Sequence, residues 1–192
     1  GADISPDTVL SGIDAAAAAG LKVKINSVLT DINKDSWPGL AELAKFRDVD
    51  VRFIELMPIG SGKEYVGVSN RELMDKLSIR FGKPERVDAK QGNGPACYRR
   101  FPGFKGSIGF ISAIHGKFCD SCNRIRLTSS GILKSCLCYD SKLDLLARIR
   151  SGATEEELAE LICEAIMNKP EAHCFEVPGQ ISEKRSMSQI GG

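Results

Sequence analysis

The sequence predicts an α/β fold, and two observations carry that prediction. Two helical patterns alternate with two apolar strand patterns over residues 5–57, a rhythm typical of βα units that form a parallel sheet. After Gly62 the rhythm changes to short apolar runs separated by Gly and Pro, followed by further helical patterns. We therefore expect a βα region followed by a region of mixed short strands and helices.

Each element of the first region has its own signal. A helix is expected after Ser5, a favourable N-cap, with Pro6 in its first turn and Gly20 as its stop. Apolar residues at helical spacing predict a second helix over 37–46. Runs rich in β-branched and apolar residues predict two strands, at 22–29 and 49–57.

The later region begins with a helix whose capping box is Ser69 and Glu72 and whose stop is Gly82. Two more helices are expected, one beginning after Asp140 and one after Thr154. The last of them is expected to bury Leu158, Leu161, Ile162, Ala165 and Ile166. Short strands are expected at 86–89, 97–101, 108–114, 124–128 and 133–139.

Composition narrows the class of protein. The chain has 192 residues, 42% of them apolar and 27% charged, which indicates a globular domain rather than a disordered chain. With 26 basic and 25 acidic residues, there is no broad basic field to bind nucleic acid or an anionic membrane. The sequence shows no secretory signal and no apolar run long enough to span a bilayer. A cytoplasmic location is therefore expected.

Among seven cysteines, the strongest motif is Cys119-x2-Cys122 followed by Cys136, which a hairpin at Gly131 would bring back toward the pair. Two thiolates separated by two residues can hold one metal centre from a single turn, and a third can close the site. Spacing leaves four interpretations open: a [4Fe–4S] cluster with one free iron, a zinc-ribbon-like site, a redox pair, or buried thiols without metal.

A zinc site would need a fourth ligand, for which Cys138 and His115 are the candidates. If residues 135–139 form a strand, Cys136 and Cys138 point to the same side. Their Cβ atoms would then be ~6.5 to 7 Å apart. That separation is awkward for one zinc ion and neutral for a cluster.

Several basic residues occupy positions suited to anions. Arg124 and Arg126 share a strand face, where they form either a fork for phosphate or carboxylate, or a solvated face. Lys24 alternates with apolar neighbours, so it faces either a polar cleft or solvent. Arg52 and Met57 lie on the second strand, near the end at which parallel α/β folds bind ligands; by parity they do not share a face.

Five segments together share their pattern with one enzyme family. They are Val23-Lys24-Ile25-Asn26, RFIELMP at 52–58, IGFIS at 108–112, FCDSCNRIRLT at 118–128 and MSQIGG at 187–192. In this order the chain resembles the GTP 3′,8-cyclases of molybdenum cofactor biosynthesis, which are radical S-adenosylmethionine enzymes. The resemblance runs over nearly the whole length.

This resemblance implies a fold and a reaction. The family has an incomplete (βα)6 barrel with a C-terminal extension, and carries two [4Fe–4S] clusters. The N-terminal cluster cleaves S-adenosylmethionine to a radical that takes a hydrogen from C3′ of GTP. The product is (8S)-3′,8-cyclo-7,8-dihydroguanosine 5′-triphosphate, which the next enzyme of the pathway uses. The chain is thus expected to be the C-terminal portion of the barrel plus an α+β extension with an iron–sulfur site.

The resemblance also implies roles for individual residues. Ligands of the C-terminal cluster would be Cys119, Cys122 and Cys136. GTP contacts would be Lys24, Arg124, Ile125 and Arg126. Met57, with Arg52 as a further candidate, would contact S-adenosylmethionine, and the Gly191-Gly192 tail would reach into the active site.

One departure from the family limits what the chain is expected to do. No C-x3-C-x2-C motif occurs among the cysteines, so the radical-generating cluster is expected only in a full-length parent, and this chain alone is predicted to be inactive. We expect three segments: barrel units at 1–62, a cluster and GTP region at 63–179, and a flexible tail at 180–192. Exposed strand edges favour pairing with the missing barrel segment or with a second copy as a homodimer.

Overall fold

The computed structural model describes residues 4–88 and 92–190. The chain divides into two compact units, each treated by itself. The first unit comprises Gly1–Leu56 and Val66–Ala113, and the second comprises Met57–Tyr65 and Ile114–Gly192.

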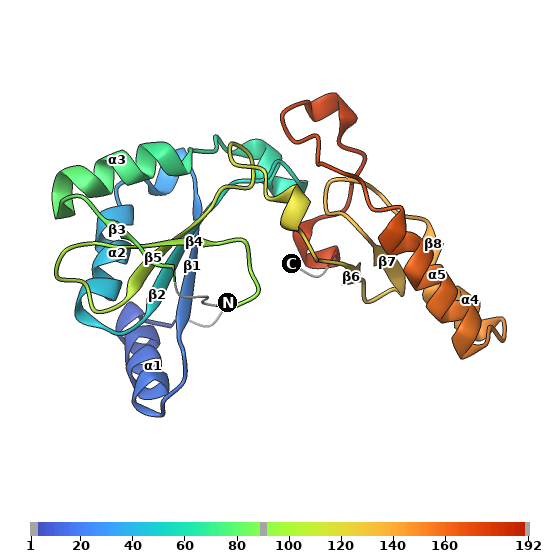
Figure 1. Ribbon diagram of the computed structural model, residues 1–192, viewed down its shortest axis with the longest axis horizontal. Coiled ribbons are helices and arrows are strands. Elements are labelled where there is room, and N and C mark those ends of the chain that lie inside the picture. The colour runs from blue at the N-terminus through green and yellow to red at the C-terminus, as the bar shows by residue number, and fades with distance from the viewer. Residues whose placement is uncertain (1–3, 89–91, 191–192) are drawn as a thin grey trace. The chain divides into compact units, whose positions relative to one another are not determined.

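Within the described residues, the first unit contains a mixed sheet of five strands in the order β1-β2-β5-β4-β3 (Figure 1). Strands β1, β2 and β5 are parallel, and β4 and β3 continue the sheet in antiparallel fashion. The strands are β1 (Lys24–Leu29), β2 (Asp50–Glu55), β3 (Glu85–Arg86), β4 (Cys97–Arg100) and β5 (Ser107–Ile111). The predicted α/β class is confirmed. Pairing of β5 with β2 joins segments that a division at residue 62 would separate.

The three predicted helices of the first unit are present, and two of them begin at the predicted caps. Ser5 Oγ accepts a hydrogen bond from Thr8 N, and Ser69 Oγ accepts one from Glu72 N, both at 3.2 Å. No helix in the described part of the chain is long and apolar enough to cross a membrane. The helices are α1 (Pro6–Ala18), α2 (Trp37–Phe46) and α3 (Asn70–Phe81).

One face of this sheet forms the main core. Helices α2 and α3 pack against β2 and against each other, and apolar side chains of alternate strand residues point toward them. Buried members of this core include Leu29, Trp37, Val51, Phe53, Leu73, Leu77, Ile108 and Phe110. By the same alternation, the opposite face carries Lys24, Asn26 and Arg52, together with the apolar Val28 and Ile54.

In the second unit, the described residues form an antiparallel sheet of three short strands, beside two helices. These elements are β6 (Arg126–Leu127), β7 (Ile132–Lys134), β8 (Leu143–Asp144), α4 (Leu145–Arg150) and α5 (Glu155–Met167). The predicted hairpin turn lies between β6 and β7, where Gly131 has φ of +85°. A Cβ at Gly131 would lie 2.3 Å from Leu146 Cβ, so glycine is required there both by conformation and by space.

Three expectations for the second unit were wrong. Strand β7 ends at Lys134, so residues 135–139 are not a strand. Helix α4 is capped by Asp144, which accepts from Ala147 N at 2.8 Å, and not by Asp140, because the residues before it turn back to pair as β8. None of the residues of α5 is fully buried, and Ile166 is 45% exposed, since the helix packs against only a small sheet and α4.

Short 3₁₀ turns complete the fold, at Asp31–Asn33, Gly60–Glu64, Cys119–Ser121, Pro178–Gln180 and Met187–Gln189. The last of them lies within residues 180–190, for which the sequence predicts loose attachment. In the structure this segment is packed: the side chains of Glu183 and Ile190 are both buried. Its attachment depends on a buried ion pair between residues far apart in the sequence, which local composition does not reveal.

Candidate functional site

The second unit brings the three predicted cluster ligands together. Cys119 opens a 3₁₀ turn that Cys122 N closes by donating to Cys119 O at 3.0 Å. Cys136 follows β7 and is half-buried. Burial raises the pKa of the Cys136 thiol, and the neighbouring Cys119 and Cys122 add to the increase. The three sulfur atoms are therefore close enough to influence one another electrostatically.

Cys122 differs from Cys136 in the direction in which its pKa is shifted. Burial alone would raise the pKa of Cys122, but hydrogen bonds from the Arg124 backbone and the Lys169 side chain outweigh it and hold that pKa below its ordinary value. Lys169 Nζ lies 3.4 Å from Cys122 Sγ. The environment thus stabilises the thiolate, the form that binds metals, more than that of an ordinary cysteine does.

These thiols fit a single metal ion and an iron–sulfur cluster differently. Among residues 4–88 and 92–190, no three His, Cys, Asp or Glu side chains are grouped so that they could hold a metal ion. In a [4Fe–4S] cluster, by contrast, each cysteine binds its own iron, so the sulfurs need not converge on one atom. Three neighbouring thiols, one of them with a lowered pKa, are a donor set that fits such a cluster.

Cys138, considered above as a fourth ligand, has other neighbours. Its thiol is fully buried, and its Sγ lies 3.2 Å from Cys174 Sγ. Both belong to an apolar cluster with Phe175 and Ile190. His115 is exposed on the segment that precedes the cysteine turn. The packing of Cys138 favours a role in the core of the second unit.

The predicted arginines lie beside the cysteine turn. Arg126 begins β6 and is half-buried; burial lowers the pKa of its guanidinium, and the neighbouring Arg124 lowers it further while Cys122 raises it. The Arg124 guanidinium lies 5.9 Å from the centre of the Phe118 ring. Ile125, between them, is 42% exposed. Two positive charges therefore adjoin the thiols, an arrangement that attracts anions.

The first unit holds a separate polar row on the sheet face opposite its core. Asn26, Arg52, Gly109 and Tyr98 are successive register partners across β1, β2, β5 and β4. Arg52 Nε donates to Asn26 Oδ1 at 2.7 Å. A Cβ at Gly109 would lie 2.9 Å from Tyr98 Cε1 and 3.0 Å from Arg52 Cγ, so the absence of a side chain lets these two meet. Lys24, two residues before Asn26, shares this face.

The remaining predicted residues fall into different places. Met57 follows the end of β2, belongs to the second unit and packs half-buried against its apolar cluster. Gly191 and Gly192 lie outside the described residues. The structure thus groups Lys24 with Arg52 in the first unit, and groups the cysteines with the two arginines in the second.

Sequence reasoning missed two residues of these groups. Lys169 follows α5 and contacts a segment 47 residues earlier, so no local pattern announces it. Tyr98 looks like an ordinary strand residue until the register places it beside Arg52. Only the folded arrangement reveals either contact.

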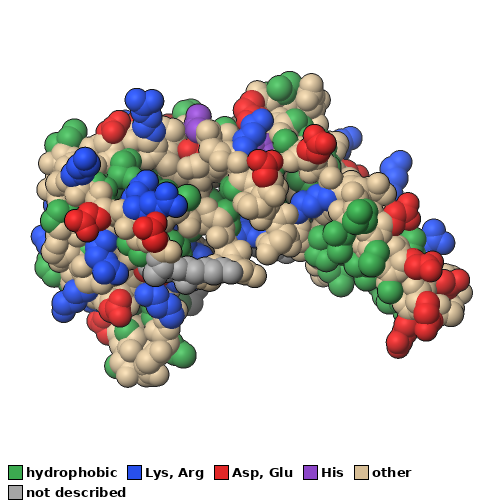
Figure 2. All heavy atoms as spheres, viewed as in Figure 1, with side chains coloured by type: hydrophobic (Ala, Val, Ile, Leu, Met, Phe, Trp, Pro, Cys, Tyr) green, Lys and Arg blue, Asp and Glu red, His purple; other side chains and the backbone are tan. Residues whose placement is uncertain are grey.

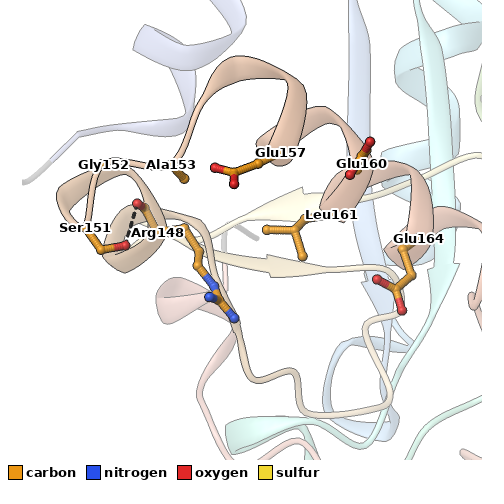
Figure 3. A pocket seen from close by; sticks show the side chains of 8 residues that line it. All are labelled: Arg148, Ser151, Gly152, Ala153, Glu157, Glu160, Leu161 and Glu164. Atoms are coloured by element: carbon orange, nitrogen blue, oxygen red, sulfur yellow. Dashed lines mark hydrogen bonds between the residues drawn. The ribbon is translucent and has the colours of Figure 1, made fainter.

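A groove of about 510 Å³ between α4 and α5 lies elsewhere in the second unit. Figure 3 shows Arg148 from α4 and the carboxylates of Glu157 and Glu164 from α5. Figure 2 shows acidic side chains gathered over this part of the unit, where α5 begins with three consecutive glutamates. No predicted site residue is among the described residues that line this groove.

Comparison with known proteins shows which family the chain belongs to. Residues 49–175 match the family model described as Molybdenum Cofactor Synthesis C. The chain belongs to this family. That match includes the three cysteines, both arginines and Arg52, so the family region covers most of the two residue groups described above.

Curated relatives of this family member are similar over nearly its whole length. It is 44% identical over 192 residues to the GTP 3′,8-cyclase of Clostridium perfringens strain SM101, covering 97% of this chain and 58% of that protein. The GTP 3′,8-cyclase of Moorella thermoacetica is 42% identical, covering 96% of this chain and 58% of its own. That of Pelotomaculum thermopropionicum is also 42% identical, covering 94% and 57%. The chain thus spans less than three fifths of these relatives, and the predicted resemblance is confirmed.

Proposed function

We propose that this chain supplies the C-terminal half of a GTP 3′,8-cyclase, which converts GTP to (8S)-3′,8-cyclo-7,8-dihydroguanosine 5′-triphosphate with a radical from S-adenosylmethionine. The observation that carries the proposal is the grouping of three thiols with two guanidiniums in the second unit. Its support is that proteins named GTP 3′,8-cyclase are 42–44% identical to this chain. This similarity favours the cyclase over a non-catalytic zinc-ribbon-like module.

Cys119, Cys122 and Cys136 would hold a [4Fe–4S] cluster. When bound through three thiolates, such a cluster supplies one iron that can accept a nitrogen or oxygen atom of the purine. The second cluster and the cleavage of S-adenosylmethionine would belong to the full-length parent, because no C-x3-C-x2-C motif occurs in this sequence.

GTP would be recognised by charge beside that cluster. Guanidiniums donate paired hydrogen bonds to phosphate oxygens, so Arg124 and Arg126 suit a triphosphate. The exposed side chain of Ile125 offers an apolar surface between them. Lys24, on the polar face of the first unit, would supply a further phosphate contact as a point charge.

S-adenosylmethionine would be contacted by Arg52 and Met57. The hydrogen bond to Asn26 and the contact with Tyr98 restrict the Arg52 side chain, and a restricted guanidinium can bind the cofactor's carboxylate with less loss of entropy. Gly191 and Gly192 would form the tail that reaches the substrate, where residues without side chains fit a crowded pocket.

The proposed partners follow from the same assignment. Strand β1 is at an edge of its sheet, and edge strands present unpaired backbone groups. We expect that edge to pair with a preceding barrel segment, or with a second copy in a homodimer. The product would pass to the next enzyme of molybdenum cofactor synthesis.

The first experiment is to measure metal and acid-labile sulfide in the chain purified without oxygen. We expect about four irons and four sulfides per chain. Cys119→Ala should lose them, and Cys163→Ala, which removes an exposed cysteine of α5, should keep them. One zinc per chain without sulfide would refute the proposal in favour of the zinc-ribbon-like module.

The second experiment is a GTP titration of the same material. Arg126→Ala should weaken binding by about 10-fold or more, since hydrogen bonds to charged groups contribute about 1.5–3 kcal/mol. Arg150→Ala, an exposed arginine of α4, should bind as the unmodified chain does. Equal affinities of the two variants would argue against the arginine assignment. Formation of 5′-deoxyadenosine by this chain alone would contradict the assignment of radical generation to the rest of the parent.

A further inference from the structure

Lys169 connects the end of α5 to the cysteine turn. Its ammonium donates hydrogen bonds to Cys122 O at 2.8 Å, to Arg124 O at 2.8 Å and to Cys122 Sγ at 3.4 Å. An ammonium has three N–H donors and no acceptor, so these atoms match its full capacity. The side chain is half-buried, which shields the contacts from water.

The segment that Lys169 contacts has little regular structure of its own. The 3₁₀ turn ends at Ser121 and β6 begins at Arg126, so residues 122–125 lie between elements. Carbonyl groups in such a segment need partners from elsewhere in the fold. By holding the carbonyls of Cys122 and Arg124 at one point, Lys169 fixes the path of the chain from a thiol to the first arginine.

The same ammonium also places a positive charge against sulfur. Hydrogen bonds to cysteine sulfurs and nearby positive charge are among the factors that set the reduction potential of an iron–sulfur cluster. Reduction adds negative charge, and a cation at 3.4 Å from a ligand sulfur stabilises the reduced form more than the oxidised form.

We infer that Lys169 is a positioning residue that orients the Cys122–Arg124 segment and raises the reduction potential of a cluster held by Cys122. The inference rests on the proposed function, because it requires a cluster at the three cysteines. It assigns to a residue outside the predicted site a double role, in the geometry of nucleotide binding and in the electronic properties of the metal centre.

The test compares variants of the chain purified without oxygen, by dye-mediated redox titration followed by electron paramagnetic resonance. Lys169→Met removes the charge and keeps an unbranched side chain, whereas Lys169→Arg keeps the charge. We expect Lys169→Met to shift the potential to more negative values and to weaken GTP binding by about 10-fold. Lys169→Arg should keep a reduction potential close to that of the unmodified chain. Lys142→Met, at an exposed lysine of the second unit, should change neither the potential nor GTP binding.

Iron and sulfide content separates the outcomes. If the unmodified chain holds no cluster, the proposed function fails, and this inference fails with it. If both it and Lys169→Met hold a cluster of unchanged potential, only the inference is overturned. If Lys169→Met loses the cluster, Lys169→Arg is compared with the neutral Lys169→Gln: a more positive potential in Lys169→Arg supports the inference, and equal potentials overturn it.

Discussion

The ammonium of Lys134 forms an ion pair with the carboxylate of Glu183, and neither side chain is exposed to solvent. Lys134 lies on β7, two residues before Cys136, and also donates to Tyr139 O. Glu183 lies in the C-terminal segment and accepts from Arg185 N at 2.7 Å. One buried ion pair therefore fastens the segment before the Gly191-Gly192 tail to the strand that leads to a proposed cluster ligand.

Removing one partner of this ion pair should be costly. Glu183→Gln leaves the Lys134 ammonium buried without its counter-charge, and such changes cost about 3–5 kcal/mol. We expect a loss of about 3 kcal/mol in the free energy of unfolding, measured by urea titration. Lys117→Met is the matched control, because it breaks a half-exposed ion pair with Glu176 and should cost less than about 1 kcal/mol. Similar losses in both variants would contradict a buried, desolvated pair.

The same pair predicts how stability depends on pH. Burial alone would raise the pKa of Glu183, but hydrogen bonds from Lys134 and Arg185 N, with the charges of Lys134 and Arg185, outweigh it and lower that pKa below its ordinary 4.5. A carboxyl group whose pKa is lower in the folded state contributes stability above its unfolded pKa, and that stability is lost as the pH falls through the folded pKa.

The free energy of unfolding should thus fall more steeply in the unmodified chain than in Glu183→Gln below about pH 4.5. Above about pH 5 the difference between the two should be constant, and it should narrow as the carboxyl group becomes protonated. Urea titrations at a series of pH values measure both curves. Parallel curves down to about pH 3 would show that the pKa of Glu183 is the same in the folded and unfolded states, which would contradict a carboxylate stabilised by Lys134.

The sequence predicts those elements of the fold whose signals are local. Caps such as Ser5 and Ser69 and the periodicity of the helices gave correct starts, because a helix end depends on a few adjacent residues. For α4 the sequence predicts a start after Asp140, whereas the helix begins after Asp144, because the pairing of β8 with β7 decides its start. Non-local pairing also decides where β7 ends, because its pairs with β6 and β8 extend no further than Lys134.

The residues of the candidate site also divide into those that the sequence could predict and those that only folding brings together. The cysteine motif and its two arginines are adjacent in the sequence, so their neighbourhood could be predicted. Lys169 and Tyr98 could not, because their contacts join residues on separate elements. The strand expected at 135–139 would place Cys138 beside Cys136 on one side, but these residues form no strand and the Cys138 thiol packs on Cys174.

That packing predicts a pattern of thiol reactivity. Burial and the neighbouring Cys174 raise the pKa of Cys138 to about 12. At about pH 8 only about one Cys138 thiol in ten thousand would be ionised, and the thiolate is the reactive form. Iodoacetamide should therefore label the exposed Cys97 and Cys163 in the folded chain and leave Cys138 and Cys174 unlabelled.

Peptide mass spectrometry after a short exposure measures this pattern. The control is the same chain in concentrated urea, in which Cys138 and Cys174 should be labelled as readily as Cys163. Labelling of Cys138 at the rate of Cys163 in the folded chain would mean that the second unit does not enclose this pair of thiols.

Two glycines of the first unit should respond to alanine in opposite directions. Gly106 N donates to Ala44 O at 2.8 Å, and a Cβ on Gly106 would lie 1.9 Å from Val49 O, a backbone atom that cannot move aside without shifting β2. Gly106→Ala should therefore cost at least about 2 kcal/mol.

Gly39 lies in α2, and apart from its chain neighbours and the backbone of its own helix no atom lies within 4 Å of an added Cβ. Gly39→Ala should stabilise the chain by about 0.5–1 kcal/mol, because alanine loses less backbone entropy in a helix. Urea titration of both variants measures the contrast, and a Gly106→Ala variant as stable as the unmodified chain would rule out the close approach of Val49.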